Sequence, residues 1–340
     1  MRIGGALVLG RTQDGPDLTE PIATAEMEQI ARYLAGSRWD EFARKGDLDC
    51  AATVDKQRYR VSLLGQTTGI GAALRLISEQ IPAFDDLGLP KRILEFADLP
   101  HGLVLVSGPT GQGKSTTLAS LVQHVARARS CHIITIEDPI EYIHSMGGSR
   151  AFIRQREVGE HTAGFAEALR HALRQDPDVI LVGEMRDPET ISTAVTAAET
   201  GHLVFSTLHV RDAIGVINRI IDSFDGAQQP QIRSELSVAL AGVVCQNLLP
   251  SAQEAGKRFP VCEIMIGTPA IRSLIREGKT HQTGSHLQSG ITDYGMLPYD
   301  LDLARHVKAG QISSQDAQMM CRDAKSYQSY LLSDLAKLEP

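Results

Sequence analysis

Residues 108–115 follow the spacing G-x-x-x-x-G-K-[ST]. Glycines at these positions let the backbone curl so that its N–H groups face an anion, and a helix that begins directly afterwards adds positive potential from its N-terminus. In such a loop Lys114 reaches the β and γ phosphates of a nucleotide, and the hydroxyl of Ser115 ligates Mg²⁺. The pattern predicts a nucleotide-binding loop made by Gly108, Pro109, Thr110, Gly111, Gln112, Gly113, Lys114 and Ser115.

A loop of this kind needs a strand before it and a helix after it, and the sequence supplies both. The apolar run 103–106 leads into the loop, and a helical pattern starts near Lys114. Further apolar runs at 133–136, 179–182 and 203–205 are each followed by a helix-compatible stretch. This alternation predicts βαβ units and a parallel sheet that is covered on both faces.

Two of the predicted strands end in carboxylates, Glu137 after the second run and Glu184 after the third. A carboxylate at a strand end is often only a solvated loop residue. Parallel strands, however, bind ligands beyond their carboxyl ends, which favours a functional role for both. Hydrolysis needs such groups to order the metal and to orient or deprotonate water. Gly183 replaces the usual aspartate of this strand, so metal ordering falls on Ser115, water and the remaining acids.

Histidines lie at both ends of the fourth run, His202 before it and His209 after it. The two cannot lie side by side on one strand, and nothing nearby completes a set of metal ligands. A lone histidine more often has a structural or surface role. His209 nevertheless follows the carboxyl end of a predicted parallel strand, where we expect it to face the γ-phosphate.

Length, charge and cysteine content limit the classes of protein to which the chain can belong. The 340 residues suggest about two domains, and the net charge of −7 argues against non-specific binding of nucleic acid. The five cysteines are far apart and form no C-x-x-C pair, which argues against a disulfide framework or structural zinc and fits a reducing cytoplasm. Residues 236–249 are apolar but contain Gly242 and Gln246 and fall short of the roughly 20 residues that span a bilayer. We predict a core helix there, and only peripheral membrane association.

The pattern changes along the chain. A helical pattern at 23–34 and strand patterns at 59–64 and 72–77 predict a small α+β domain at the N-terminus. Prolines and Gly88 between residues 80 and 90 are typical of a connector. Beyond Gly267 the patterns are helical, at 269–277, 301–308 and 314–325.

Together these motifs resemble the secretion-superfamily ATPases, from about Gly46 to about Gly295, and within them the branch that retracts type IV pili. The matching segments are a Walker A segment at 108–116, which adds Thr116 to the nucleotide-binding set, an Asp box at 135–142, the run 155–158, a Walker B segment at 176–187 and a His box at 200–209. The segment 263–277 is the most telling for the retraction branch, with Ser273 where the family usually has Asn.

The resemblance implies an α/β protein with a RecA-like P-loop NTPase core on a parallel sheet, a small α+β, PAS-like N-terminal domain and a C-terminal helical subdomain. We place the N-terminal domain at 1–84, the ATPase core at 85–267 and the helical subdomain at 268–340. The family normally has a further helix and strand before the point where this chain begins. The N-terminal domain is therefore expected to be shortened at its start.

The resemblance also implies ATP as the nucleotide and Mg²⁺ as the metal. It makes Glu184 the leading catalytic acid, Glu137 a positioner of metal or water, and His209 a sensor of the γ-phosphate, with the choice of base between Glu137 and Glu184 left open. The expected metal ligands are Ser115, Glu137 and Glu184. Without the resemblance, we would interpret Arg60 and Arg75 as surface charges. They match, however, family arginines that approach the γ-phosphate and neutralise transition-state charge.

The implied function is a homo-hexameric motor that hydrolyses ATP and drives pilus retraction, and hence twitching motility. Its expected place is the cytoplasm at the inner face of the inner membrane. There it would act through an inner-membrane platform protein, with no direct contact to nucleic acid and no membrane contact except through that partner.

Three alternatives stay open. The same motor could serve pilus extension, type II secretion or conjugation, although the segment 272–277 and the lack of a zinc-binding cysteine cluster argue against this. A non-catalytic, nucleotide-binding subunit that regulates such a ring is disfavoured by the intact Lys114, Ser115, Glu137 and Glu184. A RecA-like nucleic-acid translocase is disfavoured by the acidic charge balance.

Overall fold

The computed structural model describes residues 2–3, 6–7, 10–12, 15–17, 21–55, 57–77, 80–144 and 147–334. The chain forms two compact units. The first comprises Met1–Gln80, Glu137–Ile143 and Gln155–Gly164, and the second comprises Ile81–Ile136, His144–Arg154 and Phe165–Pro340. The long N-terminal stretch of the first unit ends close to the predicted boundary at residue 84, and the three-domain assignment stays a prediction.

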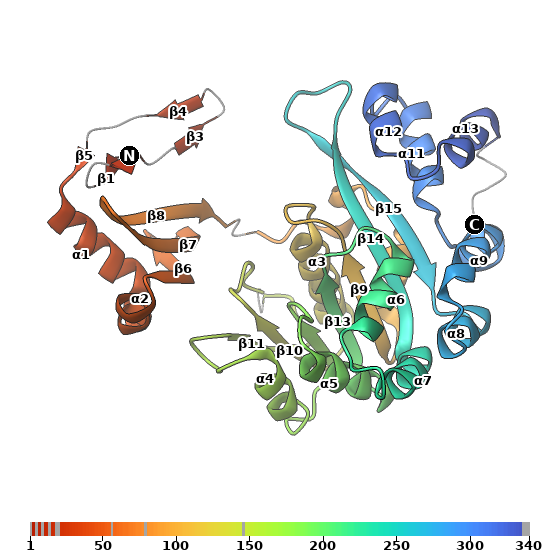
Figure 1. Cartoon of the computed structure of the whole chain (residues 1–340), viewed down its shortest axis with the longest axis horizontal. Helices are drawn as coiled ribbons and strands as arrows, with labels where there is room; N and C mark the ends of the chain where they lie inside the picture. Colours follow the sequence, from red (N-terminus) through yellow and green to blue (C-terminus); the bar gives the residue numbers. More distant parts are fainter. Residues whose placement is uncertain are drawn as a thin grey trace. The chain divides into compact units, whose positions relative to one another are not determined.

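The first unit is a helical pair packed on a three-stranded antiparallel sheet (Figure 1). Its main elements are α1 (Thr24–Ala35), η1 (Gly36–Arg38), α2 (Trp39–Lys45), β6 (Asp47–Val54), β7 (Gln57–Gln66) and β8 (Gly69–Leu76). Short strands precede them: β1 (Arg2–Ile3), β2 (Ala6–Leu7), β3 (Gly10–Thr12), β4 (Gly15–Asp17) and β5 (Pro21–Ile22). Met27 and Phe42 from the helices meet Val61 and Leu63 from β7 in a buried core. The predicted helix and strands of this region are confirmed.

The second unit is built on a seven-stranded sheet in the order β11-β10-β12-β13-β9-β14-β15. Its strands are β9 (Gly102–Ser107), β10 (His132–Glu137), β11 (Phe152–Glu157), β12 (Val179–Val182), β13 (Leu203–Leu208), β14 (Leu240–Pro250) and β15 (Arg258–Ile266). Strands β10, β12, β13, β9 and β14 run parallel, while β15 is antiparallel to β14. The predicted parallel sheet is confirmed, and each of its four predicted strands is present.

Helices surround this sheet. They are η2 (Phe84–Leu87), η3 (Lys91–Asp98), α3 (Lys114–Ala128), α4 (Phe165–Ala172), α5 (Pro188–Glu199), α6 (Ala213–Asp222) and α7 (Gln229–Ala239). The sheet core is apolar throughout, since β9, β12 and β13 are buried along their whole length, as expected for parallel strands covered on both faces.

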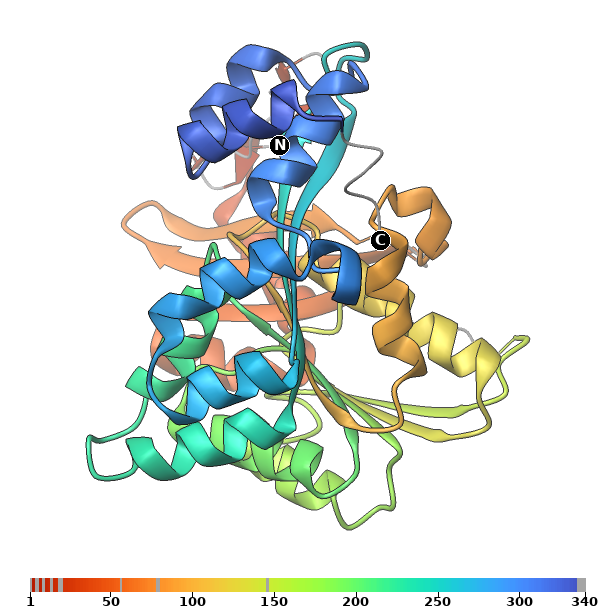
Figure 2. The ribbon, with the colours of Figure 1, turned by 90° about the vertical axis from the view of Figure 1, so that its right-hand side faces the viewer.

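The C-terminal part is helical, as predicted: α8 (Pro269–Arg276), η4 (Thr280–Gln282), α9 (Thr283–Ser289), α10 (Ile291–Tyr294), α11 (Tyr299–Lys308), α12 (Ser314–Met320) and α13 (Ala324–Leu332). The predicted helix over 314–325 is divided in two, because α12 ends before Cys321 and α13 begins at Ala324. Helix α11 packs against β15, and α13 packs against α11, so this segment lies beside the β14–β15 hairpin (Figures 1 and 2).

The prediction of a core helix at 236–249 is wrong. Helix α7 ends at Ala239, and Leu240 begins β14, which pairs with β9 on one side and β15 on the other. Gly242 permits a close approach here, because a Cβ atom at this position would lie 2.3 Å from the ring of Phe96. Within the described part of the chain, no helix is long and apolar enough to cross a membrane.

Candidate active site

The loop 108–115 joins β9 to α3 at the carboxyl edge of the sheet, in the predicted context. Gly108 has a φ of 142°, and a Cβ atom there would lie 2.3 Å from the carbonyl oxygen of Gln246. Gly111 and Gly113 also have positive φ values, 80° and 82°. Because side chains rarely adopt these conformations, the glycines are required for the loop to curl. Ser115 lies exposed in the first turn of α3, directly after Lys114.

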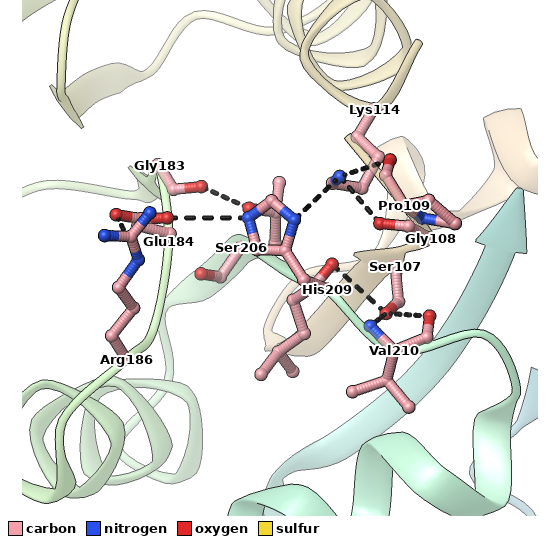
Figure 3. A network of polar contacts seen from close by, with 12 residues as sticks. Ser107, Gly108, Pro109, Lys114, Gly183, Glu184, Arg186, Ser206, His209 and Val210 are labelled. Atoms are coloured by element: carbon pink, nitrogen blue, oxygen red, sulfur yellow. Dashed lines mark hydrogen bonds and ion pairs between the residues drawn. The ribbon is translucent and has the colours of Figure 1, made fainter. Parts of the chain in front are cut away.

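Lys114 folds back into this loop. Its Nζ donates hydrogen bonds to the carbonyl oxygens of Gly108, at 2.8 Å, and Pro109, at 3.0 Å. The same nitrogen lies 3.4 Å from Nδ1 of His209, which follows β13 (Figure 3). Lys114 is buried, so its ammonium group is held in the concave side of the loop and next to His209.

His209 stands between Lys114 and Glu184 (Figure 3). Its Nε2 lies 3.6 Å from Oε2 of Glu184, and Oε1 of Glu184 forms an ion pair with Nε of Arg186 at 2.7 Å. Burial, followed by the positive charge of Lys114, lowers the pKa of His209 below its ordinary value, and the nearby Glu184 opposes this shift. The imidazole is therefore neutral at pH 7 and can accept or donate a hydrogen bond.

Glu184 owes its position to β12 and β13. Ser206 Oγ donates to the carbonyl oxygen of Val182 at 2.7 Å, and Thr207 Oγ1 donates to that of Gly183 at 2.5 Å. These bonds continue the pairing of β12 with β13 past the last strand residue. The side chain of Glu184 is 16% exposed, against 74% for that of Arg186, so the carboxylate is sheltered and its partner is not.

Ser107, the last residue of β9, fixes the backbone after His209. Its hydroxyl accepts a hydrogen bond from the N–H of Val210 at 3.0 Å. It lies 2.7 Å from the carbonyl oxygen of Val210 and 3.2 Å from that of Leu208, to which it can donate. His209 is therefore flanked on both sides by residues that contact one fully buried hydroxyl.

Gln246 on β14 supports the phosphate-binding loop from behind. Its Nε2 donates to the carbonyl oxygen of Gln112 at 2.7 Å, and its Oε1 accepts from Oγ1 of Thr117 at 2.8 Å. The side chain of Gln112 in turn accepts a hydrogen bond from the N–H of Leu248 at 2.5 Å. The loop is thus fastened to a central strand of the sheet through a buried glutamine.

No role is predicted from the sequence for Ser107, Arg186 and Gln246. Gln246 carries a usable signal, since it is a polar residue inside the long apolar run that the sequence presents as a helix. Ser107 adjoins the phosphate-binding loop and Arg186 lies within the Walker B segment at 176–187, but only the structure shows what their side chains contact.

Glu137 lies at the end of β10 and is assigned to the first unit. Its Oε1 accepts a hydrogen bond from Nε2 of Gln155 at 3.2 Å. Glu157, two residues further along β11, accepts from the Ile140 N–H at 3.0 Å and pairs with Arg58 at 2.8 Å. The run 155–158 therefore contacts Glu137 and Ile140 of the Asp box at 135–142.

Arg60 and Arg75 are direct partners across β7 and β8 in the first unit. Their side chains share one face of the sheet, since residues directly opposite each other in a strand pair point the same way. Arg60 also pairs with Glu141, with 3.4 Å between Nη1 and Oε1. Two like charges placed opposite each other are destabilising unless an anion lies nearby. The roles of Glu137, Arg60 and Arg75 at a phosphate stay predictions.

The described residues hold no group of three or more His, Cys, Asp and Glu side chains that could bind a metal by themselves. A magnesium ion in a nucleotide site needs fewer protein ligands, because it keeps several waters and takes phosphate oxygens. Ser115 offers an exposed position at the loop, and Glu184 offers carboxylate oxygens. These are hard oxygen donors, so the residue types suit Mg²⁺.

The chain is similar to several known proteins. A model of the family described as "Type II/IV secretion system protein" matches residues 44–326. The type IV pilus retraction ATPase PilT of Pseudomonas aeruginosa is 48% identical over 261 residues, which are 77% of this chain and 74% of that protein. The uncharacterised protein YggR of Escherichia coli K12 is 42% identical over 294 residues, which are 86% of this chain and 89% of that protein.

A solved structure, described as the pilus retraction motor PilT with bound ADP, superimposes with a TM-score of 0.81. It is 42% identical and covers 93% of this chain and 89% of its own. This likeness extends over both units and confirms the predicted α/β, RecA-like class of fold.

Proposed function

The chain belongs to the type II/IV secretion system protein family, and we propose that it is an ATPase motor that drives retraction of a type IV pilus. The observation that carries the proposal is the convergence of Lys114, His209 and Glu184 beyond the carboxyl ends of neighbouring parallel strands. The similarity to a retraction ATPase over three quarters of the chain supports pilus retraction as the process that this site would drive.

Binding of ATP falls to the loop 108–116. The curled backbone offers N–H groups to the phosphates, and the N-terminus of α3 adds positive potential. The Nζ atom of Lys114 now satisfies its hydrogen bonds with the carbonyl oxygens of Gly108 and Pro109, and phosphate oxygens are the stronger partners for an ammonium group. Nucleotide binding therefore requires a change of hydrogen-bond partners at Lys114.

Hydrolysis needs a group that orients or deprotonates water, and Glu184 is the leading candidate. Its carboxylate is sheltered and held by Arg186 on one side and His209 on the other. The neutral imidazole of His209 bridges from Glu184 to Lys114, so it is placed to register the γ-phosphate that Lys114 binds. Glu137 is kept as the second candidate for positioning metal or water.

Magnesium would be held by Ser115 with Glu184, whose oxygens fit the ion, and the role of Glu137 as a further ligand stays a prediction. When bound, Mg²⁺ supplies neutralisation of charge on the phosphate oxygens. Glu184 then keeps its proposed role of orienting water, and Lys114 keeps its contact with the phosphates.

The motor is also proposed to be a homo-hexameric ring. The roles of Arg60 and Arg75 at a phosphate stay a prediction from the family resemblance, since the structure pairs Arg60 with Glu141. The motor is proposed to work in the cytoplasm at the inner face of the inner membrane, on a platform protein of the pilus.

A steady-state ATPase assay on the purified protein tests the enzymatic part. We expect Mg²⁺-dependent hydrolysis that is abolished by EDTA and falls by about 100-fold or more in Glu184→Gln, since the carboxylate is lost while its size is kept. Glu199→Gln, an exposed acid at the end of α5, is the matched control and should leave the rate unchanged. Background activity in the wild-type hexamer would instead favour a regulatory, non-catalytic subunit.

A further inference from the structure

The side chain of Arg322 joins the backbone that follows His209 to the C-terminal helical segment. Arg322 lies in the turn between α12 and α13. Its Nη2 donates to the carbonyl oxygen of Arg211, two residues after His209. Its Nη1 donates to the carboxylate of Glu263 on β15. A residue more than a hundred positions away in sequence therefore contacts the loop that carries the proposed phosphate sensor.

Glu263 makes the second contact to the same loop. Its Oε1 accepts a hydrogen bond from the N–H of Ala213 at 2.7 Å, at the start of α6. Burial raises the pKa of this carboxyl, and the charge of Arg322 opposes that shift. Arg322 and Glu263 thus hold the backbone at Arg211 and Ala213 together. The buried carboxylate of Glu263 depends on the guanidinium of Arg322 for its charge partner.

Arg322 is itself held in place by α11. Asp300, a buried residue of that helix, accepts hydrogen bonds from the backbone N–H of Arg322 at 2.8 Å and of Asp323 at 2.9 Å. The guanidinium carbon lies 4.1 Å from the ring centroid of Tyr299, the first residue of α11. Both the backbone and the side chain of Arg322 are therefore fixed before it reaches the loop.

Ser107 holds the same loop from the opposite direction, through Val210. Residues 210–213 are consequently bonded at Val210 to the strand that leads into the nucleotide-binding loop, and at Arg211 and Ala213 to the Arg322–Glu263 pair. His209 is the residue immediately before this doubly fixed segment, and its ring contacts Lys114 and Glu184.

We propose that Arg322 is a positioning residue for ATP hydrolysis, which acts through the carbonyl group of Arg211 to fix His209 between Lys114 and Glu184. The C-terminal helical segment then forms part of the hydrolytic machinery without touching the nucleotide. This inference rests on the proposed ATPase function. It also implies that movement of α11 to α13 alters the rate of hydrolysis, because the Arg322 turn moves with Asp300.

The test must avoid leaving Glu263 buried without a partner. We therefore use Arg322→Gln together with Glu263→Gln, since the glutamine at 263 keeps an acceptor for the Ala213 N–H. In a steady-state ATPase assay we expect kcat to fall about 10-fold while KM for ATP stays within about twofold, because positioning of His209 is lost and the phosphate loop is intact. Lys325→Gln, which removes an exposed charge from α13, should change neither constant.

Arg322→Lys separates positioning from folding. A lysine keeps the charge beside Glu263, but it lacks the planar fork that serves two acceptors at once. We expect its thermal unfolding midpoint to match that of the wild type while kcat stays low.

Two results would overturn the proposal. One is a double variant with the kcat of the wild type. The other is a loss of kcat that follows the fraction of folded protein, with Arg322→Lys fully active. Absence of hydrolysis in the wild-type protein under the same conditions would instead refute the proposed ATPase function, so the two failures are distinguishable.

Discussion

Replacement of Gln246 by leucine should weaken nucleotide binding, although Gln246 is placed behind the loop and not in it. The substitution removes two hydrogen bonds. Thr117 keeps an acceptor, because its Oγ1 also donates to the carbonyl oxygen of Gly113 at 3.1 Å. The carbonyl oxygen of Gln112 loses its buried donor, which costs about 1–3 kcal/mol. If this cost falls on the loop conformation that binds phosphate, affinity for ATP drops about 5- to 140-fold.

The assay is a titration with a fluorescent, non-hydrolysable ATP analogue at fixed Mg²⁺ concentration. Gln231→Leu is the matched control, because Gln231 is exposed on α7, where its Nε2 donates to Glu235 at 2.8 Å. Gln246→Glu keeps the acceptor for Thr117 but sets a carboxylate against the Gln112 carbonyl, and we expect it to bind at least as weakly as the leucine variant. Wild-type affinity in Gln246→Leu, with an unchanged unfolding midpoint, would refute the role of Gln246.

Three further perturbations test other parts of the site and the fold. Ser107→Ala should lower kcat about fivefold, because the Val210 backbone loses a buried hydroxyl worth about 1 kcal/mol, whereas Ser107→Thr should retain the rate in the same assay. The kcat/KM of the wild type should fall as pH drops through the pKa of His209, which is lowered below its ordinary value of 6.5, because protonation sets a second cation beside Lys114. This fall at acid pH should disappear in a pH profile of His209→Asn. Gly242→Ala should reduce the free energy of unfolding by about 1–3 kcal/mol in chemical denaturation, since its Cβ would overlap the Phe96 ring, and an unchanged denaturation midpoint would contradict the packing described for β14.

The phosphate-binding loop can be predicted from the sequence because the residues that define it lie close together in the chain. Glycine spacing, the preceding apolar run and the helix that starts at Lys114 all lie within a short segment, and each agrees with the others. The parallel strands were predictable for a related reason, since short apolar runs followed by helical patterns define βαβ units.

Strand β14 was not predictable in the same way. A fully buried strand and a buried helix both present continuous apolar residues, so periodicity does not separate them. The segment 240–250 forms a strand because it pairs with β9 and β15, which are remote in sequence. Gly242, which counts against a helix and leaves room for Phe96, is the local residue that could have indicated the strand.

The supporting contacts of the site depend on the same long-range pairing. Ser107 meets Val210, and Arg322 meets Arg211, because β13 lies beside β9 and the C-terminal helices lie beside β15. Neither side chain belongs to a spacing pattern that sequence reasoning can detect. The residues predicted to contact phosphate can therefore be identified from the sequence, while those that position them become visible only in the fold.

We propose that ATP hydrolysis at Glu184 drives pilus retraction. The most direct test is to count surface pili and to measure twitching motility in host cells whose only copy of this protein carries Glu184→Gln. We predict extra pili and lost movement, because pili are built but not withdrawn. Loss of pili would contradict the claim by making this motor the one that builds them, and an unchanged count with normal motility would place it in another machine.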